Sequence, residues 1–335
     1  MKGLCVKTFF KALLILIGLT SSVSAAPKTV FLVLWDGCED ACRGFRDALQ
    51  NNGVSAVLNV RDLQKDLSKI PDLIAEIKQT KPDLLATWGT LPTVSLVGTV
   101  NGAPPDFTAF VPTVFMVVSQ PVESGLAAAL SAQGRNITGV SHLPPVTEQL
   151  QAARQFKLFD RLGIVYNASD IGAASVVEQI KKYAALMNFD VIDRSLPLDG
   201  AGNPDASRIP ALVTEIAEQK AGLIYLPPDV VMNENRALLA QSAFDAGIPV
   251  FSASEGAVRS GGALFAYVHR YYTVGLAAGN KAARILQNGV PAFDIPIDTP
   301  HRGLFVVNMT AARRLGVYPP AALVQGADLI DVPTD

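Results

Sequence analysis

The sequence predicts an α/β protein of two Rossmann-like lobes, each built on a parallel sheet. Apolar runs of strand length alternate with segments of helical periodicity after residue 26. One helix-and-strand unit occurs twice, at residues 70–90 and 209–229. The chain has 335 residues, about twice the usual length of one domain. Together these observations favour two similar lobes over one domain.

The elements of the first half follow from local patterns. Residues 30–34 form a continuous apolar run, which suits a strand buried on both faces. Residues 41–49 then repeat apolar side chains at helical spacing, and Asn52-Gly53 ends that helix. The same reasoning predicts strands at residues 57–60, 84–87 and 113–118, and a helix at residues 70–77.

The second half resumes the alternation. Strands are predicted at residues 163–166 and 223–226, and helices at residues 176–187 and 238–246. Strands that alternate with helices are joined by right-handed crossovers and form a parallel sheet covered on both faces.

The repeated unit aligns without a gap. Both copies begin with Ile-Pro and keep the same helical face, a lysine and the following strand in one register. Chance similarity between two helix–strand units is the alternative. The match ends at Thr90 and Asp229, which follow the carboxyl ends of two strands. In open parallel sheets this edge is where ligands bind.

The amino terminus has the order of a secretory signal peptide. Three lysines precede a short apolar run at residues 12–19, and Val23-Ser24-Ala25 supplies small residues for cleavage. A membrane anchor is the alternative, but the run is far shorter than the roughly 20 residues that span a bilayer. We therefore expect residues 1–25 to be removed and the mature protein to be soluble and periplasmic.

Composition limits the classes of partner. Hydrophobic residues make up 49% and charged residues 17%, with a net charge of −2, so the chain can fill a large core and is a poor match for nucleic acid. The compartment allows a disulfide between Cys38 and Cys42; free thiols or a metal pair are the alternatives. The three histidines are far away in sequence, and we expect no metal and no cofactor.

Several short segments stand in a characteristic order and spacing: Gly44-Phe45-Arg46, Gly89-Thr90, residues 136–141, residues 247–251, Tyr272 with Gly275, residues 283–289, and Asn308 with Ala311, Leu315 and Gly316. Together they resemble the ABC-transporter substrate-binding family that includes tryptophan- and tyrosine-binding periplasmic proteins. The resemblance implies a type I periplasmic binding fold with three crossings between lobes. It places residues 26–141 and 263–290 in lobe 1, and residues 142–262 and 291–335 in lobe 2. Trp88 departs from the small residue usual before the Gly-Thr pair.

The three crossings have candidate positions. Residues 139–146 contain Pro144-Pro145, which continues neither a helix nor a central strand. Gly261-Gly262 and residues 289–296 are the candidates for the other two. Closing such lobes by a hinge motion removes a ligand from water.

Thr90 and Asp229 are the leading candidates for binding. The Thr90 hydroxyl could hold a ligand carboxylate, and Asp229 could pair with a ligand ammonium. The alternative for both is a helix cap. Glu255 is the other candidate partner for a ligand cation. The remaining residues expected to border the cleft are Asp36, Cys38, Trp88, Ser141, His142, Asn167, Ser169 and Ser254.

The sequence favours a binding protein over an enzyme. It contains no G-x-S-x-G elbow, no H-E-x-x-H motif and no phosphate-binding G-x-x-x-x-G-K-[ST] loop. The resemblance implies a monomeric capture subunit that delivers an amino acid or related small molecule to an ABC permease in the inner membrane. A sensory partner of a membrane kinase or chemoreceptor is the alternative, and a secreted hydrolase a remote one. The identity of the ligand is left open.

Overall fold

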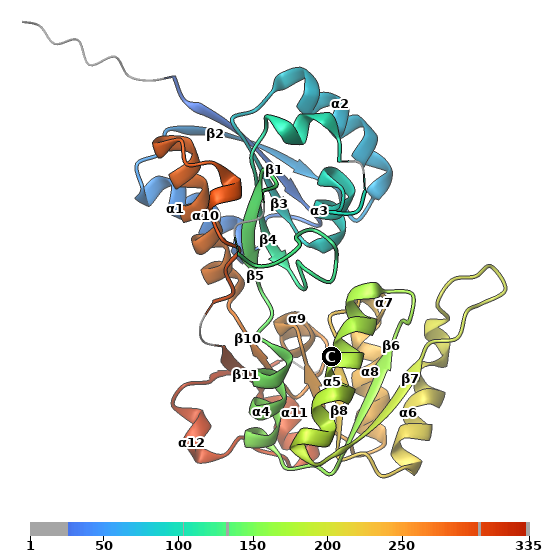
Figure 1. Cartoon of the computed structure of the whole chain (residues 1–335). Helices are drawn as coiled ribbons and strands as arrows, with labels where there is room; N and C mark the ends of the chain where they lie inside the picture. Colours follow the sequence, from blue (N-terminus) through green and yellow to red (C-terminus); the bar gives the residue numbers. More distant parts are fainter. Residues whose placement is uncertain (1–25, 103, 132–133, 301–302, 333–335) are drawn as a thin grey trace, which may run out of the picture.

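A computed structural model describes residues 26–102, 104–131, 134–300 and 303–332 as two α/β lobes, one above the other in Figure 1. The expected signal peptide at residues 1–25 lies outside the described residues. Among the described residues, every helix is too short or too polar to cross a membrane.

Lobe 1 is built on a five-stranded, fully parallel sheet of order β2-β1-β3-β4-β5. Apolar clusters fill both faces of the sheet, as expected for strands with continuous apolar runs. The strands are β1 (Lys28–Leu34), β2 (Ala56–Asp62), β3 (Leu84–Trp88), β4 (Thr113–Val118) and β5 (Ile137–Ser141), and the helices are α1 (Asp40–Asn51), α2 (Ile70–Thr80), α3 (Thr90–Val97) and α10 (Tyr271–Asn288), with 3₁₀ turns at residues 67–69, 106–109 and 292–294.

Lobe 2 is built on a seven-stranded sheet of order β12-β11-β10-β9-β8-β6-β7, in which only β10 and β11 pair antiparallel. Two apolar clusters again cover its faces. The strands are β6 (Arg161–Tyr166), β7 (Asp190–Ser195), β8 (Leu223–Leu226), β9 (Val250–Ser252), β10 (Phe265–Val268), β11 (Leu304–Asn308) and β12 (Asp328–Ile330), and the helices are α4 (Val146–Phe156), α5 (Ile171–Met187), α6 (Ile209–Glu218), α7 (Val230–Glu234), α8 (Arg236–Asp245), α9 (Glu255–Ser260), α11 (Met309–Leu315) and α12 (Ala321–Val324), with a 3₁₀ turn at residues 206–208.

Two details of the expected lobe limits are wrong. Residues 263–268 were placed in lobe 1, but β10 pairs with β9, and the ring of Phe265 stacks on that of Phe251 at 4.8 Å between centroids. Gly261-Gly262 is therefore a turn inside lobe 2. Residues 291–298 were placed in lobe 2, but Asp298 bridges to Val140 of β5 in lobe 1. Pairing between strands, which sequence spacing does not reveal, decides both limits.

The crossings follow from this correction. The chain passes from β5 to α4 at residues 142–145, from β10 to α10 at residues 269–270, and from lobe 1 to β11 after Asp298. Because the last crossing returns the chain from lobe 1, β11 enters its sheet in the opposite direction to β10.

The predicted repeat is confirmed, with one copy in each lobe. Asp66 and Asp205 cap equivalent 3₁₀ turns by accepting a hydrogen bond from the backbone two residues on. The turns lead into α2 and α6, each with proline in its first turn. Lys81 and Lys220 then take the same left-handed conformation, with φ of 47° and 60°. The strands that follow, β3 and β8, belong to different sheets.

Candidate functional site

The carboxyl ends of the two parallel sheets face each other. Strand β5 enters lobe 2 at its carboxyl end, and β10 enters lobe 1 at its carboxyl end. The parallel neighbours of each strand end at the same edge. The residues that follow these strands therefore line the two surfaces between the lobes, where open α/β sheets bind ligands.

Thr90 lies at this edge of lobe 1. Gly89, with φ of 90°, allows α3 to begin directly after β3, so Thr90 is the first residue of the helix. Its side chain is half-buried, and its Oγ1 accepts a hydrogen bond from the backbone N–H of Ser119 at 3.2 Å. Gly89, rather than Thr90, occupies the cap position, so the hydroxyl is not used as the N-cap of α3.

A strained segment holds the partner of Thr90. Val117 has φ of 58°, a left-handed conformation that is unfavourable for a β-branched residue and costs on the order of 1–3 kcal/mol. The irregularity shifts the pairing of β4 with β5. It presents Ser119, whose N–H donates to Thr90 and whose carbonyl accepts from the Ser141 hydroxyl at 3.2 Å. Such strain concentrates at functional sites.

Asp229 holds the equivalent position in lobe 2 but is used differently. Its carboxylate caps α7, with Oδ1 accepting from the Met232 N–H at 3.0 Å. Oδ2 accepts from the Asn167 N–H at 2.6 Å, which ties the β8 loop to the β6 loop. Burial raises the pKa of Asp229 to about 6, although its hydrogen bonds to backbone N–H groups act in the opposite direction.

Asp229 is buried, so its carboxylate is not open to the space between the lobes. Its side chain is 0% exposed, because Pro227-Pro228 turn the chain so that the carboxylate lies under α7. Asn167 is also buried, and its Oδ1 accepts from the backbone N–H of Ser169 at 3.0 Å. Ser169 itself is exposed. The structural role of a helix cap therefore accounts for the contacts of Asp229.

Glu255 is the other candidate carboxylate of lobe 2, and the residue is 9% exposed. It is the first residue of α9, and its Oε2 accepts from the Arg259 Nε at 3.0 Å. Arg259 also pairs with Asp328 at 2.6 Å. Ser254 precedes the helix and donates from its hydroxyl to Oδ1 of Asn233 at 3.0 Å.

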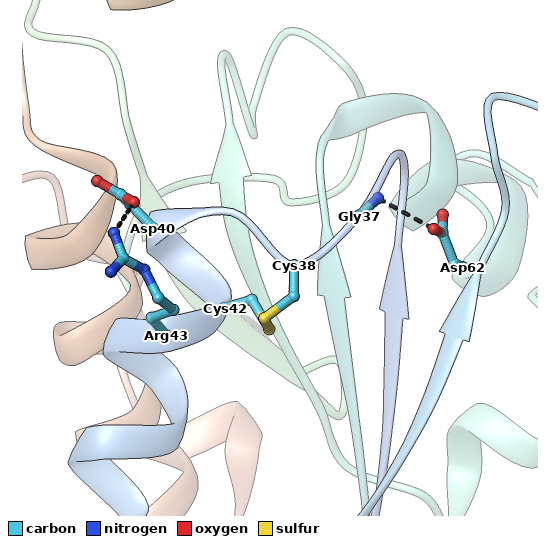
Figure 2. Close-up of a disulfide and its surroundings, with 6 residues drawn as sticks. All are labelled: Gly37, Cys38, Asp40, Cys42, Arg43 and Asp62. Atoms are coloured by element: carbon cyan, nitrogen blue, oxygen red, sulfur yellow. Dashed lines mark hydrogen bonds and ion pairs between the residues drawn. A yellow bond between two sulfur atoms is a disulfide. The ribbon is translucent and has the colours of Figure 1, made fainter.

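Asp36 and Cys38 occupy the loop between β1 and α1 of lobe 1. Asp36 is exposed and pairs with Lys65 at 3.2 Å. Cys38 forms a disulfide with Cys42, with 5.2 Å between the Cα atoms, and Figure 2 shows the bridge beside the start of α1. Of the three alternatives for these cysteines, the structure contains the disulfide, so Cys38 has no free thiol for a ligand.

Three aromatic rings meet where two crossings lie side by side. Trp88 and His142 contact the Tyr271 ring edge-on, with centroids 6.2 and 5.5 Å away. His142 is buried, and burial lowers its pKa to about 4. Its carbonyl contacts Nδ1 of His269 at 3.2 Å, which joins the first crossing to the second. Within the described parts of the chain, Trp88 Nε1 and His142 Nδ1 are buried and have no hydrogen-bond partner.

Sequence reasoning missed Glu39, Ser119 and Tyr271. Tyr271 is the first residue of α10 and joins the aromatic group through Trp88 and His142. Glu39 precedes α1, and no motif marks it. Only their position in the fold could have indicated them. Glu39 precedes α1, Tyr271 begins α10 and Ser119 follows β4, all at the edge of lobe 1 that faces lobe 2.

The arrangement suits reversible binding better than bond-breaking chemistry. Polar side chains follow the strand ends of both lobes, and no group of three metal-ligating side chains occurs among the described residues. Two surface hollows of about 350 and 340 Å³, lined by residues such as Arg46 and Asp160, lie away from the strand ends. The site is thus formed by two facing surfaces that closure would bring together.

Comparison with known proteins places this geometry in context. The family model described as "ABC transporter substrate binding protein" matches residues 29–330. A "Tyrosine-binding protein" of Clostridioides difficile is 25% identical over 296 residues, which cover 87% of this chain and 81% of the relative.

Solved structures agree on the fold. An ABC domain from Streptococcus pneumonia in complex with L-Trp is 20% identical, with a TM-score of 0.74 over 91% of this chain and 99% of that one. A leucine binding protein from Thermotoga maritima is 13% identical, with a TM-score of 0.58 over 80% of this chain and 84% of that one. The expected type I periplasmic binding fold is confirmed.

Proposed function

Because this chain belongs to the ABC transporter substrate binding protein family, we propose that it captures an aromatic amino acid between its lobes and delivers it to an ABC permease. The observation that carries the amino-acid proposal is the pair of facing strand edges. They set the half-buried Thr90 hydroxyl and the Trp88 and Tyr271 rings of lobe 1 opposite the polar loops of lobe 2. The tyrosine- and tryptophan-binding relatives support the same ligand class.

The ligand would be held from both sides. Thr90, at the first turn of α3, would donate its hydroxyl proton to the ligand carboxylate, where the positive end of the helix dipole favours an anion. Trp88 and Tyr271 would contact an aromatic side chain. Asn167, Ser169 and Ser254 of lobe 2, with Ser141 and His142 at the crossing, would border the closed site.

Closure would be a hinge motion about the three crossings. The first two are joined by the contact between His142 and His269, and Pro144-Pro145 keep the first from continuing as a helix. Removing the ligand from water strengthens each polar contact. The closed form would be the one that a permease recognises.

Members of this family act outside the cytoplasm. We further propose that the chain is cleaved after Ala25 and acts in the periplasm as a monomer. Mass spectrometry of the periplasmic fraction should then find a chain that begins at Ala26, and retention of the full-length chain in the inner membrane would contradict cleavage.

The test of the ligand class is a titration of the chain from Ala26 onward. L-tyrosine, L-tryptophan and L-phenylalanine should raise the melting temperature, since a ligand at 100 times its Kd adds about 2.7 kcal/mol of stability. Thr90→Val should weaken the binding found by calorimetry by about 1–2 kcal/mol, the size of one hydroxyl hydrogen bond.

Thr80→Val is the matched control. Its hydroxyl donates to the Glu76 carbonyl at 2.7 Å, at the end of α2 and away from the strand ends, so affinity should not change. Stabilisation by another class of solute, with none by amino acids, would contradict the proposed ligand.

A further inference from the structure

Building on the proposed capture of an amino acid, we propose that the ligand ammonium is bound by Glu39 and Glu255, one carboxylate from each lobe, beside the Tyr271 ring. The site would thereby select ligands that carry an amine, and the ligand's own positive charge would favour closure.

Helix packing brings Glu39 next to Tyr271. Glu39 occupies the cap position of α1 but makes no side-chain hydrogen bond to the helix. Helices α1 and α10 lie against each other in Figure 1, and a Cβ at Gly275 would overlap the carbonyl of Ala41. This close approach places the start of α1 beside the start of α10, where Tyr271 is the first residue. Glu39 therefore lies at the edge of lobe 1, and its carboxylate does not cap α1.

A chain of ion pairs holds Glu255 near the same point from lobe 2. Its Oε2 is bound to Arg259, which also pairs with Asp328, and Asp328 lies 4.0 Å from Arg270. Arg270 directly precedes Tyr271. Among the residues that the structure describes, the hydrogen bond to Glu255 is made to Oε2, which leaves Oε1 to accept a hydrogen bond from a ligand.

The pKa values of Glu39 and Tyr271 both respond to the carboxylate of Glu255. Loss of hydration raises the pKa of Glu39, and the carboxylates of Asp36, Asp40 and Glu255 raise it further, while Lys65 opposes them only weakly. The pKa of Tyr271 is raised by burial and then by Glu255 and Glu39. Three carboxylates and one lysine therefore act on Glu39, so negative charge predominates around it.

Two buried polar atoms at the same aromatic group also lack partners. His142 is 6% exposed, and its Nδ1 has no hydrogen bond within the described chain; neither has Trp88 Nε1. Both rings contact Tyr271. Leaving buried donors or acceptors unpaired is unfavourable, so native proteins reserve such atoms for ligands or water. The indole N–H can only donate and requires an acceptor, whereas the carboxylates require a donor.

These requirements match the two ends of a zwitterion. An oxygen near Thr90 and Trp88 would satisfy the donors, and an ammonium near Glu39 and Glu255 would satisfy the carboxylates. Without a cation, two like charges on opposite lobes repel each other and oppose closure. An ammonium between them converts that repulsion into two charge-assisted hydrogen bonds.

The experiment compares three probes that share one side chain: L-tyrosine, its deaminated acid 3-(4-hydroxyphenyl)propionate, and its decarboxylated amine tyramine. Calorimetry should show that wild-type protein binds the deaminated acid at least about 100-fold more weakly than L-tyrosine, because buried charges are left unpaired. Glu39→Gln and Glu255→Gln should each weaken L-tyrosine by about tenfold or more and leave the deaminated acid nearly unchanged.

Asp40→Asn is the matched control. It removes one negative charge next to Glu39, but Asp40 pairs only with Arg43 of its own helix (Figure 2), so affinity should stay within about threefold. If Glu255→Gln fails to fold because its pairing with Arg259 is lost, Glu39→Gln carries the test, since Glu39 makes no such contact.

The outcomes separate this inference from the proposed function. Two results would contradict ammonium binding by Glu39 and Glu255 and leave the amino-acid function intact. In the first, the deaminated acid binds as tightly as L-tyrosine. In the second, both variants weaken the two ligands equally. If tyramine alone binds, and the two variants abolish its binding, the role of Glu39 and Glu255 is supported and the amino-acid function is wrong. If none of the three probes binds, and L-tryptophan and L-phenylalanine also fail to bind, the amino-acid function is contradicted and this inference falls with it.

Discussion

Thr90 and Asp229 occupy the same position in a repeated unit, yet the two lobes use that position differently. Thr90 is half-buried and accepts one hydrogen bond, from Ser119. Asp229 is fully buried and accepts two, one within α7 and one from the loop after β6. The segments that precede the two positions differ. Gly89 starts α3 at once, whereas Pro227-Pro228 fold the chain back before α7. Equivalent strand ends therefore need not supply equivalent ligand contacts.

The largest expected effect tests the structural role of Asp229. Asp229→Ala leaves the buried N–H groups of Asn167 and Met232 without acceptors, which should lower the free energy of unfolding by about 3 kcal/mol. Urea unfolding at pH 5 measures this, because the carboxyl is then mostly protonated and little buried charge is removed with it. Asp229→Asn keeps one acceptor and should lose less. Equal stability of both variants and wild type would show that the two hydrogen bonds do not hold the loop.

The next effect is a dependence on pH. The folded-state pKa of Asp229 is raised from 3.8 to about 6, so the folded protein binds this proton more tightly than the unfolded chain does. The resulting stability is fully present below pH 3.8 and is lost as the pH rises through about 6. Wild type should therefore lose on the order of 2 kcal/mol relative to Asp229→Asn between pH 4 and pH 7.

The variant serves as the reference because His142 acts in the opposite direction. Its folded-state pKa is lowered from 6.5 to about 4, so its contribution is lost as the pH falls through that range. Both proteins contain His142, and its effect cancels in the difference. A difference that stays constant with pH would mean that Asp229 titrates normally.

The smallest effect concerns Thr90 in the unliganded protein. Thr90→Val removes the acceptor of the Ser119 N–H at a half-buried site, where water can replace it in part. The free energy of unfolding should fall by about 1 kcal/mol or less, measured by urea unfolding at pH 7. A loss as large as that of Asp229→Ala would contradict the contrast between the lobes and would assign Thr90 a mainly structural role.

The sequence by itself determined the architecture and its repeat. Local patterns predicted these elements. The apolar runs at residues 30–34 and 113–118 have the length of buried strands, and the apolar residues after Ile70 and Ile209 repeat at helical spacing. Both copies begin a helix with Ile-Pro and end it before a left-handed lysine, Lys81 or Lys220. These features match because the two copies share the same local sequence pattern. The position of Thr90 and Asp229 just beyond strand ends was predictable for the same reason.

Only the tertiary structure decided how those residues are used. The burial of Asp229 and the pairing of β10 with lobe 2 depend on the placement of separate segments of the chain. The approach of Glu39 to Tyr271 requires glycines on two helices that are more than 200 residues apart in the chain. Desolvation and hydrogen bonding depend on distances in space, and a sequence pattern specifies distance only along one helix or strand.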